Sequence, residues 1–157
     1  MRKTVKKFKG FTLVELIVVI GIISILAAIL TPTFIKYVDS ARIAKLNTNA
    51  RQVYGAATYA IADVAVSPNC GKVVPNDIYT GDTSDHIARS NGGGLLDVSD
   101  YLSSDYVGSF AFELNSSGSC IYALWSNESI SASDIAQLTQ QDIESLHIGC
   151  YPIKEDP

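Results

Sequence analysis

The most apolar part of the chain is an uninterrupted run from Phe11 to Leu30 that contains one charged residue, Glu15. A helix over these residues spans ~30 Å, which is about the thickness of the hydrocarbon layer of a bilayer. A buried core helix would keep a polar stripe, and this run has none. The pattern therefore predicts a helix that inserts into a membrane.

Two residues are expected to weaken this helix. Gly21 lacks a side chain, and Pro32 lacks an N–H and clashes with the preceding turn. They predict a kink or a locally melted turn near residues 28–30. The alternative is a helix end, with a second helix starting at Pro32 behind a Thr31 cap. Either arrangement predicts a flexible joint.

Beyond Pro32, apolar residues recur at alternating spacings of three and four, which predicts an amphipathic helix. It is expected to run to about Ala65, to end before Ser67-Pro68, and to pack against a sheet. A coiled-coil partner is the less favoured alternative, because most of the positions are Ala or Val. The positions of this stripe are Ile43, Leu46, Ala50, Val53, Ala57, Ala60 and Val64.

Residues 67–108 are rich in Gly and Pro and predict loops, with one short helix over Leu96–Ser103. Within them, the glycine run Asn91–Gly94 follows no clear strand and is flanked by acids. It is therefore not interpreted as a phosphate-binding loop.

The remaining pattern predicts a hairpin followed by one helix and one strand. Ser109–Leu114 and Cys120–Trp125 alternate as strands do, and Asn115–Ser119 joins them. Ser131–Ser145 reads as an amphipathic helix, and Leu146–Ile153 as a third strand. We expect residues 36–157, without the apolar segment, to form a soluble monomer with its own core.

The expected architecture is α+β, with one long N-terminal helix packed on a small antiparallel sheet. The expected parts are a leader (1–10), an apolar helix (11–31), an amphipathic helix (32–66), an αβ-loop (67–108) and the sheet with its C-terminal region (109–157).

Basic residues are concentrated at the N-terminus. The first ten residues hold five of the 12 basic residues and no acid, which leaves seven bases against 16 acids in the remainder, a formal charge of -9. This balance disfavours non-specific nucleic-acid binding. The leader charges are expected to keep the N-terminus in the cytoplasm. An ordinary signal peptide would be cut after the apolar run, near Ala27-Ala28, whereas cleavage at Gly10 leaves the helix on the mature protein.

Placing the Glu15 carboxylate in the bilayer costs roughly 2.5–3.5 kcal/mol or more of free energy, so we expect it to have a partner. A cation from another subunit would suit this role, and cleavage after Gly10 would create one in the new α-amino group of Phe11. The alternative is that Glu15 lies shallow enough to reach the headgroups.

The string Lys9-Gly10-Phe11-Thr12-Leu13-Val14-Glu15-Leu16 resembles the processing site of type IV prepilins and pseudopilins. The resemblance implies a pilin-like roll, cleavage after Gly10 by a membrane prepilin peptidase, and N-methylation of Phe11. It also implies that Glu15 is required for assembly, and it matches Pro32 to the helix-bending proline of the family.

The leading functional hypothesis is a structural subunit of an extracellular type IV pilus that supports adhesion or motility. Its expected partners are other pilin subunits in a helical homopolymer, the pilus assembly machinery, the prepilin peptidase and, before assembly, the membrane. The alternatives are a minor pilin that binds an insoluble polysaccharide or takes up DNA, and a pseudopilin of a type II-like secretion system. An anchored enzyme is least favoured, because no catalytic set stands out. No cofactor and no metal are expected.

Three cysteines allow three pairings. Cys120 opens one predicted strand and Cys150 lies in another, so Cys120–Cys150 is the candidate disulfide, with pairing to Cys70 or reduced thiols as alternatives. A zinc site that combines the cysteines with His86 or His147 is disfavoured, because the chain has no C-x-x-C pair.

Two further groups of residues could form binding sites. The acids near the C-terminus lack calcium-loop spacing; they are Asp142, Glu144, Glu155 and Asp156. The aromatic residues Tyr122, Trp125 and Tyr151 are interpreted as sheet core in preference to a carbohydrate platform.

Overall fold

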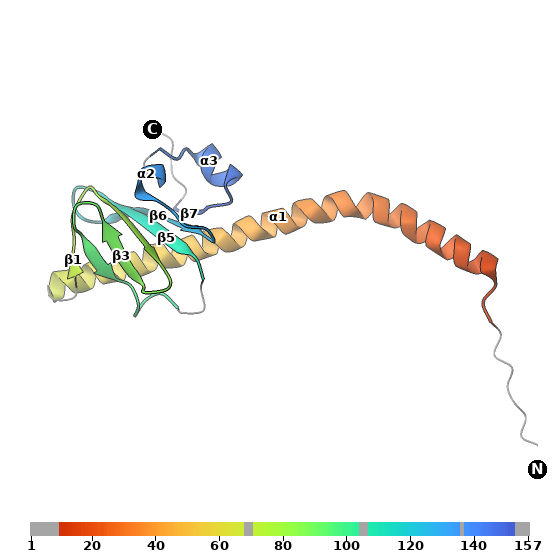
Figure 1. The fold of residues 1–157 in the computed structure, drawn as a ribbon, viewed down its shortest axis with the longest axis horizontal. Coiled ribbons are helices and arrows are strands. Elements are labelled where there is room, and N and C mark those ends of the chain that lie inside the picture. The colour runs from red at the N-terminus through yellow and green to blue at the C-terminus, as the bar shows by residue number, and fades with distance from the viewer. Residues whose placement is uncertain (1–9, 68–70, 104–106, 136, 153–157) are drawn as a thin grey trace, which may run out of the picture. The chain divides into compact units, whose positions relative to one another are not determined.

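The computed structural model describes residues 10–67, 71–103, 107–135 and 137–152. The chain divides into two compact units, Met1–Ser40 and Ala41–Pro157. Helix α1 contributes residues to both units (Figure 1), and the sheet lies in the second unit. Each unit is described separately below.

Helix α1 spans Leu13–Val66 as one continuous helix, and Gly21 and Pro32 lie inside it. The predicted melted turn near residues 28–30 and the alternative of a new helix starting at Pro32 are therefore wrong. Helical residues on both sides hold the proline in place, and the Thr31 hydroxyl donates a hydrogen bond to the carbonyl oxygen of Ala27 at 2.7 Å. A kink at Gly21 or Pro32 stays a prediction. The predicted end of the helix before Ser67 is confirmed.

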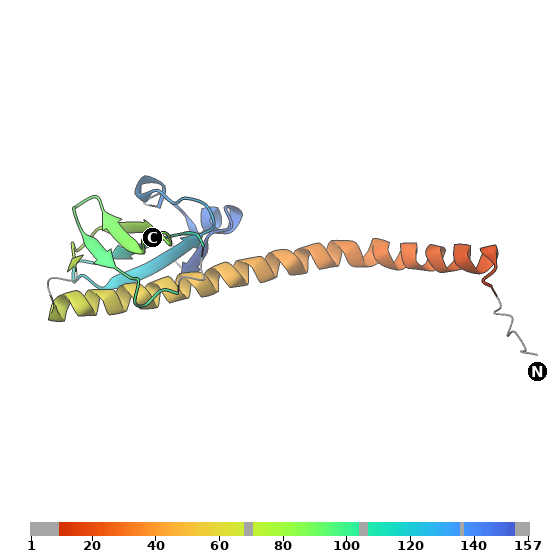
Figure 2. The same cartoon turned by 60° about the horizontal axis from the view of Figure 1, so that its bottom comes forward.

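The described residues form one seven-stranded sheet in the order β1-β4-β3-β2-β5-β6-β7, and every neighbouring pair is antiparallel. The predicted hairpin is confirmed as β5 and β6. Figure 2 shows the sheet beside the part of α1 that follows Ala41. The strands are β1 (Gly71–Lys72), β2 (Ile78–Asp82), β3 (Ile87–Ser90), β4 (Leu95–Asp97), β5 (Ser109–Leu114), β6 (Cys120–Ser126) and β7 (Gly149–Tyr151).

The segment predicted as loops contributes four of these strands, β1 to β4, so that prediction is wrong. Each strand is only two to five residues long, which is too short for alternation to be recognised. The glycine run is the turn between β3 and β4. The Gly93 N–H donates to the Ser90 carbonyl at 3.1 Å, and Gly93 adopts a φ of 80°, a conformation that glycine accepts readily.

The described core has one cluster on each face of the sheet. The apolar stripe of α1, including Leu46, Ala50 and Val53, packs against sheet residues such as Phe112 and Trp125. The prediction that this stripe packs on a sheet is confirmed. The second cluster joins sheet residues to the two short helices α2 (Ala132–Ile135) and α3 (Gln140–Ser145). It includes Leu124, Ile135, Ile143 and Ile148.

Three predicted elements differ in extent from the observed ones. Leu96 lies in strand β4, and residues 99–102 form turns, so no helix covers Leu96–Ser103. The helix predicted over residues 131–145 is two separate short helices, α2 and α3. The third predicted strand is shorter, because β7 covers only Gly149–Tyr151 among the described residues.

Candidate functional site

Helix α1 begins with a reciprocal set of hydrogen bonds between Thr12 and Glu15. The backbone N–H and the hydroxyl of Thr12 each donate to Oε2 of Glu15 at 2.8 Å, and the Glu15 N–H donates to Oγ1 of Thr12 at 3.3 Å. This arrangement is a capping box, which satisfies backbone N–H groups that lack partners in the first helical turn. The sequence interpretation assigned Glu15 no role within its own helix. The Thr-x-x-Glu spacing is the signal that predicts one.

The capping box uses one of the two oxygens of Glu15. Both bonds from Thr12 end on Oε2, and no described residue donates to Oε1. A carboxylate accepts several hydrogen bonds, so Oε1 remains able to accept a donor from another chain. The side chain is thus fixed at the start of the helix with one oxygen available.

The residues that flank the expected cleavage position are exposed. Phe11 is 87% exposed, and a Cβ built on Gly10 would meet no atom within 4 Å. Gly10 also has no positive φ. Neither packing nor backbone conformation in the described chain therefore requires glycine at this position.

The first part of α1 presents apolar side chains that no other described residue covers. Helix α1 is long and apolar enough to cross a membrane, and none of its apolar window is buried. Two hydroxyls in this part, those of Ser24 and Thr31, donate to the backbone carbonyls of Ile20 and Ala27 in the same helix, each at 2.7 Å. These polar groups are thus satisfied without water, as a lipid or dry protein environment requires.

The predicted Cys120–Cys150 disulfide is wrong. Cys120 is a buried free thiol, whereas Cys150 pairs in register with Leu124, four positions further along β6. That offset is ~13 Å at the rise of a strand, and a disulfide requires Cα atoms about 4.4–6.8 Å apart. The two cysteines also belong to core clusters on opposite faces of the sheet. Cys70 lies outside the described residues, so its pairing stays a prediction.

The aromatic residues Tyr122, Trp125 and Tyr151 belong mostly to the core, as predicted. Trp125 and Tyr122 are 1% and 5% exposed. Tyr151 is half-buried, with its ring edge-on to Tyr54 at 5.5 Å and with Arg51 over its face at 5.3 Å. These rings leave little surface for a ligand.

No three His, Cys, Asp or Glu residues come together as metal ligands in the part of the chain that the structure describes. Asp142 instead caps α3, accepting hydrogen bonds from the backbone N–H and the hydroxyl of Thr139 at 3.1 and 2.7 Å. Glu155 and Asp156 lie outside the described residues. Cys70 lies outside them too, so the expectation of no metal site stays a prediction.

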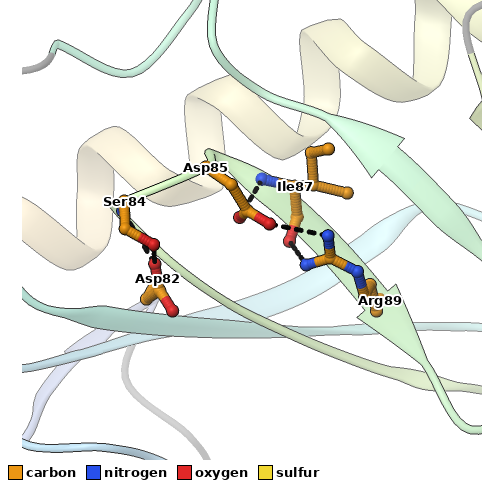
Figure 3. Close-up of polar contacts among 5 residues, drawn as sticks. All are labelled: Asp82, Ser84, Asp85, Ile87 and Arg89. Atoms are coloured by element: carbon orange, nitrogen blue, oxygen red, sulfur yellow. Dashed lines mark hydrogen bonds and ion pairs between the residues drawn. The ribbon is translucent and has the colours of Figure 1, made fainter.

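The turn between β2 and β3, together with the start of β3, carries a cluster of polar contacts (Figure 3). Asp85 forms an ion pair with Arg89 at 2.6 Å and accepts the N–H of Ile87 at 3.0 Å. Asp82 accepts the N–H of Ser84 at 2.7 Å and also its hydroxyl. The hydrogen bonds from Arg89 and Ile87 lower the pKa of Asp85, and those from Ser84 lower the pKa of Asp82. Each carboxylate stabilises its own turn, so we interpret this cluster as structural.

Comparison with known proteins gives two kinds of match. Residues 5–31 match the family described as the prokaryotic N-terminal methylation motif. The chain is 46% identical over 70 residues to the type IV narrow pilus major component PilA5 of Thermus thermophilus, covering 43% of this chain and 59% of that protein. It is 46% identical over 48 residues to the type IV major pilin protein PilA of Myxococcus xanthus, covering 31% of this chain and 22% of that protein.

The chain thus spans less than two thirds of the length of these relatives. No solved structure gives a significant match.

Proposed function

We propose, from the prepilin methylation motif and the type IV pilin homologues, that this chain is a structural subunit of a type IV pilus. In this proposal the leader is removed after Gly10, the new N-terminus at Phe11 is methylated, and the mature chain polymerises through the first part of α1. The filament then supports adhesion or motility at the cell surface.

The observation that carries the proposal is the uncovered apolar helix with a single carboxylate at its start. Side chains from Leu13 to Val38 are exposed, including Ile17, Ile22 and Leu26. Burial of apolar surface is favourable by about 25 cal/mol per Å². The exposed side chains of this helix are therefore expected to be covered by lipid or by another protein. Lipid covers them before assembly, and the helices of neighbouring subunits cover them afterwards.

The open surroundings of Gly10 support the proposal that the chain is cleaved after this residue. Glycine is not required by the packing of the described residues around it, and it lies next to an exposed Phe11. The proposed reason for glycine at this position is recognition by the peptidase. Its active site must approach the backbone closely, and glycine has no side chain to prevent this. The five basic residues of the leader would hold this site on the cytoplasmic side.

Assembly would use the oxygen of Glu15 that the capping box leaves available. The α-amino group of a neighbour's Phe11 would donate to Oε1, while Thr12 continues to hold Oε2. In a dry filament core this pair would be strongly attractive, because the local dielectric is low. The same pairing would neutralise the one charge in the apolar segment.

An apolar hollow beside Pro32 offers a further contact for neighbouring helices. It is an open groove between side chains of this one helix, and its lining includes Ala27, Leu30, Phe34 and Tyr37. A bulky side chain from another subunit would fit such a hollow. This hollow is a secondary support, since lipid chains would fill it equally well.

Electron microscopy of sheared surface material, labelled with antibody against residues 71–152, tests the proposal. Label distributed along the length of thin filaments is the expected result. A preparation in which the protein stays entirely in the membrane fraction, or in which label occurs only at filament tips, would contradict a structural-subunit role.

A further inference from the structure

A second surface feature lies in the sheet-bearing unit, far along α1 from the N-terminal motif. Tyr59 and Tyr101 stack with ring centroids 5.6 Å apart and an interplanar angle of 26°. Tyr59 is 63% exposed, whereas most aromatic residues of the sheet are buried. The pair borders an open pocket of about 570 Å³, within the usual range of roughly 300–1,000 Å³ for small-molecule sites.

The pocket is held in place by buried neighbours. Tyr101 lies in a turn in which the N–H of Leu102 donates to the carbonyl of Val98 at 2.9 Å. Val98 and Leu102 are both in the core, at 1% and 3% exposure. The Tyr101 hydroxyl donates to Asp63 on α1. The stacked pair is therefore positioned before any ligand arrives.

Gly55 is a second unusual feature of this pocket. It lies in the interior of α1, where glycine stabilises a helix less than alanine does, and it lines the pocket. A Cβ built on it would meet no atom within 4 Å, so packing among the described residues does not require glycine. Glycine does keep the floor of the pocket open beside the tyrosine rings.

We propose that this pocket binds a neutral oligosaccharide, with one sugar ring stacked on Tyr59. A sugar ring has an apolar face of C–H groups that suits an aromatic surface, and it has hydroxyls that need hydrogen-bond partners at its edge. Gln52 and Asp100 also line the pocket, and the carboxylate of Asp100 can accept hydrogen bonds from those hydroxyls.

The negative charge around the pocket disfavours anionic ligands among those that stack on aromatic rings. Asp63 and Asp100 lie beside the tyrosines, and residues 11–157 carry seven bases against 16 acids. Anionic polysaccharides and single-stranded DNA would therefore be repelled, although DNA bases also stack well on tyrosine. A neutral sugar avoids this repulsion. The inference is independent of filament formation.

Saturation-transfer NMR on the mature full-length chain tests the inference. The chain is held in micelles of a detergent without a sugar headgroup, because a glycoside detergent would compete for the pocket. The neutral probes are cellohexaose, maltohexaose and chitohexaose. The anionic probes are hexagalacturonate and the oligonucleotide (dT)6. We expect at least one neutral probe to bind with a Kd of about 1 mM or below, and neither anionic probe to bind comparably.

Four variants locate the binding. Tyr59→Ala should weaken it about tenfold or more, and Tyr59→Phe should retain it because the ring remains. Gly55→Leu should abolish it by filling the floor with a good helix-forming residue, so this test survives if Tyr59→Ala misfolds. Thr58→Ala, at an exposed neighbouring position outside the pocket lining, is the matched control and should bind as wild type.

Circular dichroism of each variant checks that the fold is intact. Failure of all three neutral probes to bind at about 10 mM would overturn the inference. Equal binding of neutral and anionic probes, or wild-type binding by folded Tyr59→Ala and Gly55→Leu chains, would overturn it as well.

Discussion

The backbone N–H of Cys150 donates a hydrogen bond to Oδ1 of Asn47 at 3.0 Å, which ties strand β7 to helix α1 across 103 residues of sequence. Next to this bond, Gly149 approaches the helix closely. A Cβ on Gly149 would lie 2.1 Å from the carbonyl oxygen of Leu46, which is far inside van der Waals contact. The last strand can therefore pack on the helix only because its first residue has no side chain.

Gly149→Ala should accordingly lower the free energy of unfolding of a fragment of residues 36–157 by roughly 1–3 kcal/mol. The added methyl group must move either β7 or the helix backbone. Gly55→Ala is the matched control, since a Cβ there meets nothing, and it should be neutral or stabilise by about 0.5–1 kcal/mol. Urea denaturation followed by circular dichroism measures both. Equal stabilities for the two variants would contradict the close packing at Gly149.

Acid should destabilise the same fragment through its paired carboxylates. Hydrogen bonds from Ser84 lower the pKa of Asp82, those from Arg89 and Ile87 lower that of Asp85, and those from Ser99 lower that of Asp97. A lowered folded pKa gives stability that is present above the unfolded value, near pH 3.8, and is lost as the pH falls through the folded value. The Tm should therefore stay nearly constant from about pH 7 to pH 5 and fall below about pH 4.

Asp85→Asn provides the control for this pH dependence. The neutral amide cannot pair with Arg89, so the variant should lose some stability near neutral pH and show a shallower fall in Tm below about pH 4. The loss should be modest, because both side chains of the ion pair are substantially exposed. A Tm that rises on acidification would contradict this account of the turn.

The thiol of Cys120 should be chemically inert in the folded protein. Burial raises its pKa to about 12, so almost no thiolate is present at neutral pH. Iodoacetamide should label Cys120 only after denaturation, as peptide mass spectrometry would show. Mapping under non-reducing conditions should find no peptide that joins Cys120 to Cys150. Rapid labelling of Cys120 in the native state, or a bridged peptide, would be inconsistent with the observed sheet register.

Processing at Gly10 should give a mature protein that begins at Phe11 and carries one added methyl group. The intact mass of protein purified from membranes measures both changes. A bulky substitution such as Gly10→Phe should leave the unprocessed chain in the membrane. Cleavage near Ala28, as for an ordinary signal peptide, would show that the helix is not retained.

The sequence predicted the parts of this fold that depend on long, regular patterns. The apolar run is recognised by its length and its single charge, whereas the stripe from Leu46 to Ala60 and the β5–β6 hairpin repeat a simple period over enough residues to be recognised. The sequence pattern did not predict strands β1 to β4, because each is short and because their pairing depends on contacts between segments. The Cys120–Cys150 error has a similar cause, because the sequence does not give the register of β7 on β6.

For the candidate site, the sequence indicated Gly10, Phe11 and Glu15 but not how Glu15 is held. The capping box with Thr12 needed only the spacing of two residues and was predictable in principle. The Tyr59–Tyr101 pair was not predictable, because it joins the helix to a turn whose position depends on β4.

The proposed role of Glu15 in assembly must be separated from its role as a helix cap. Thr12→Ala removes the capping partner but keeps the carboxylate, and it should cost about 1 kcal/mol of helix stability. If capping were the whole function of Glu15, Thr12→Ala and Glu15→Val would reduce filament numbers to a similar extent. Ser24→Ala, whose wild-type hydroxyl bonds only to its own helix, serves as a neutral control in the same segment.

In the proposed filament, Glu15 pairs with the Phe11 amine of a neighbouring subunit. The decisive measurement is the count of surface filaments in a strain whose only subunit carries Glu15→Val. An unpaired, buried amine should cost on the order of 3–5 kcal/mol per subunit. We therefore predict normal cleavage and membrane insertion with few or no filaments, while Thr12→Ala and Ser24→Ala strains retain most of theirs. Wild-type filament numbers in the Glu15→Val strain would contradict the pairing.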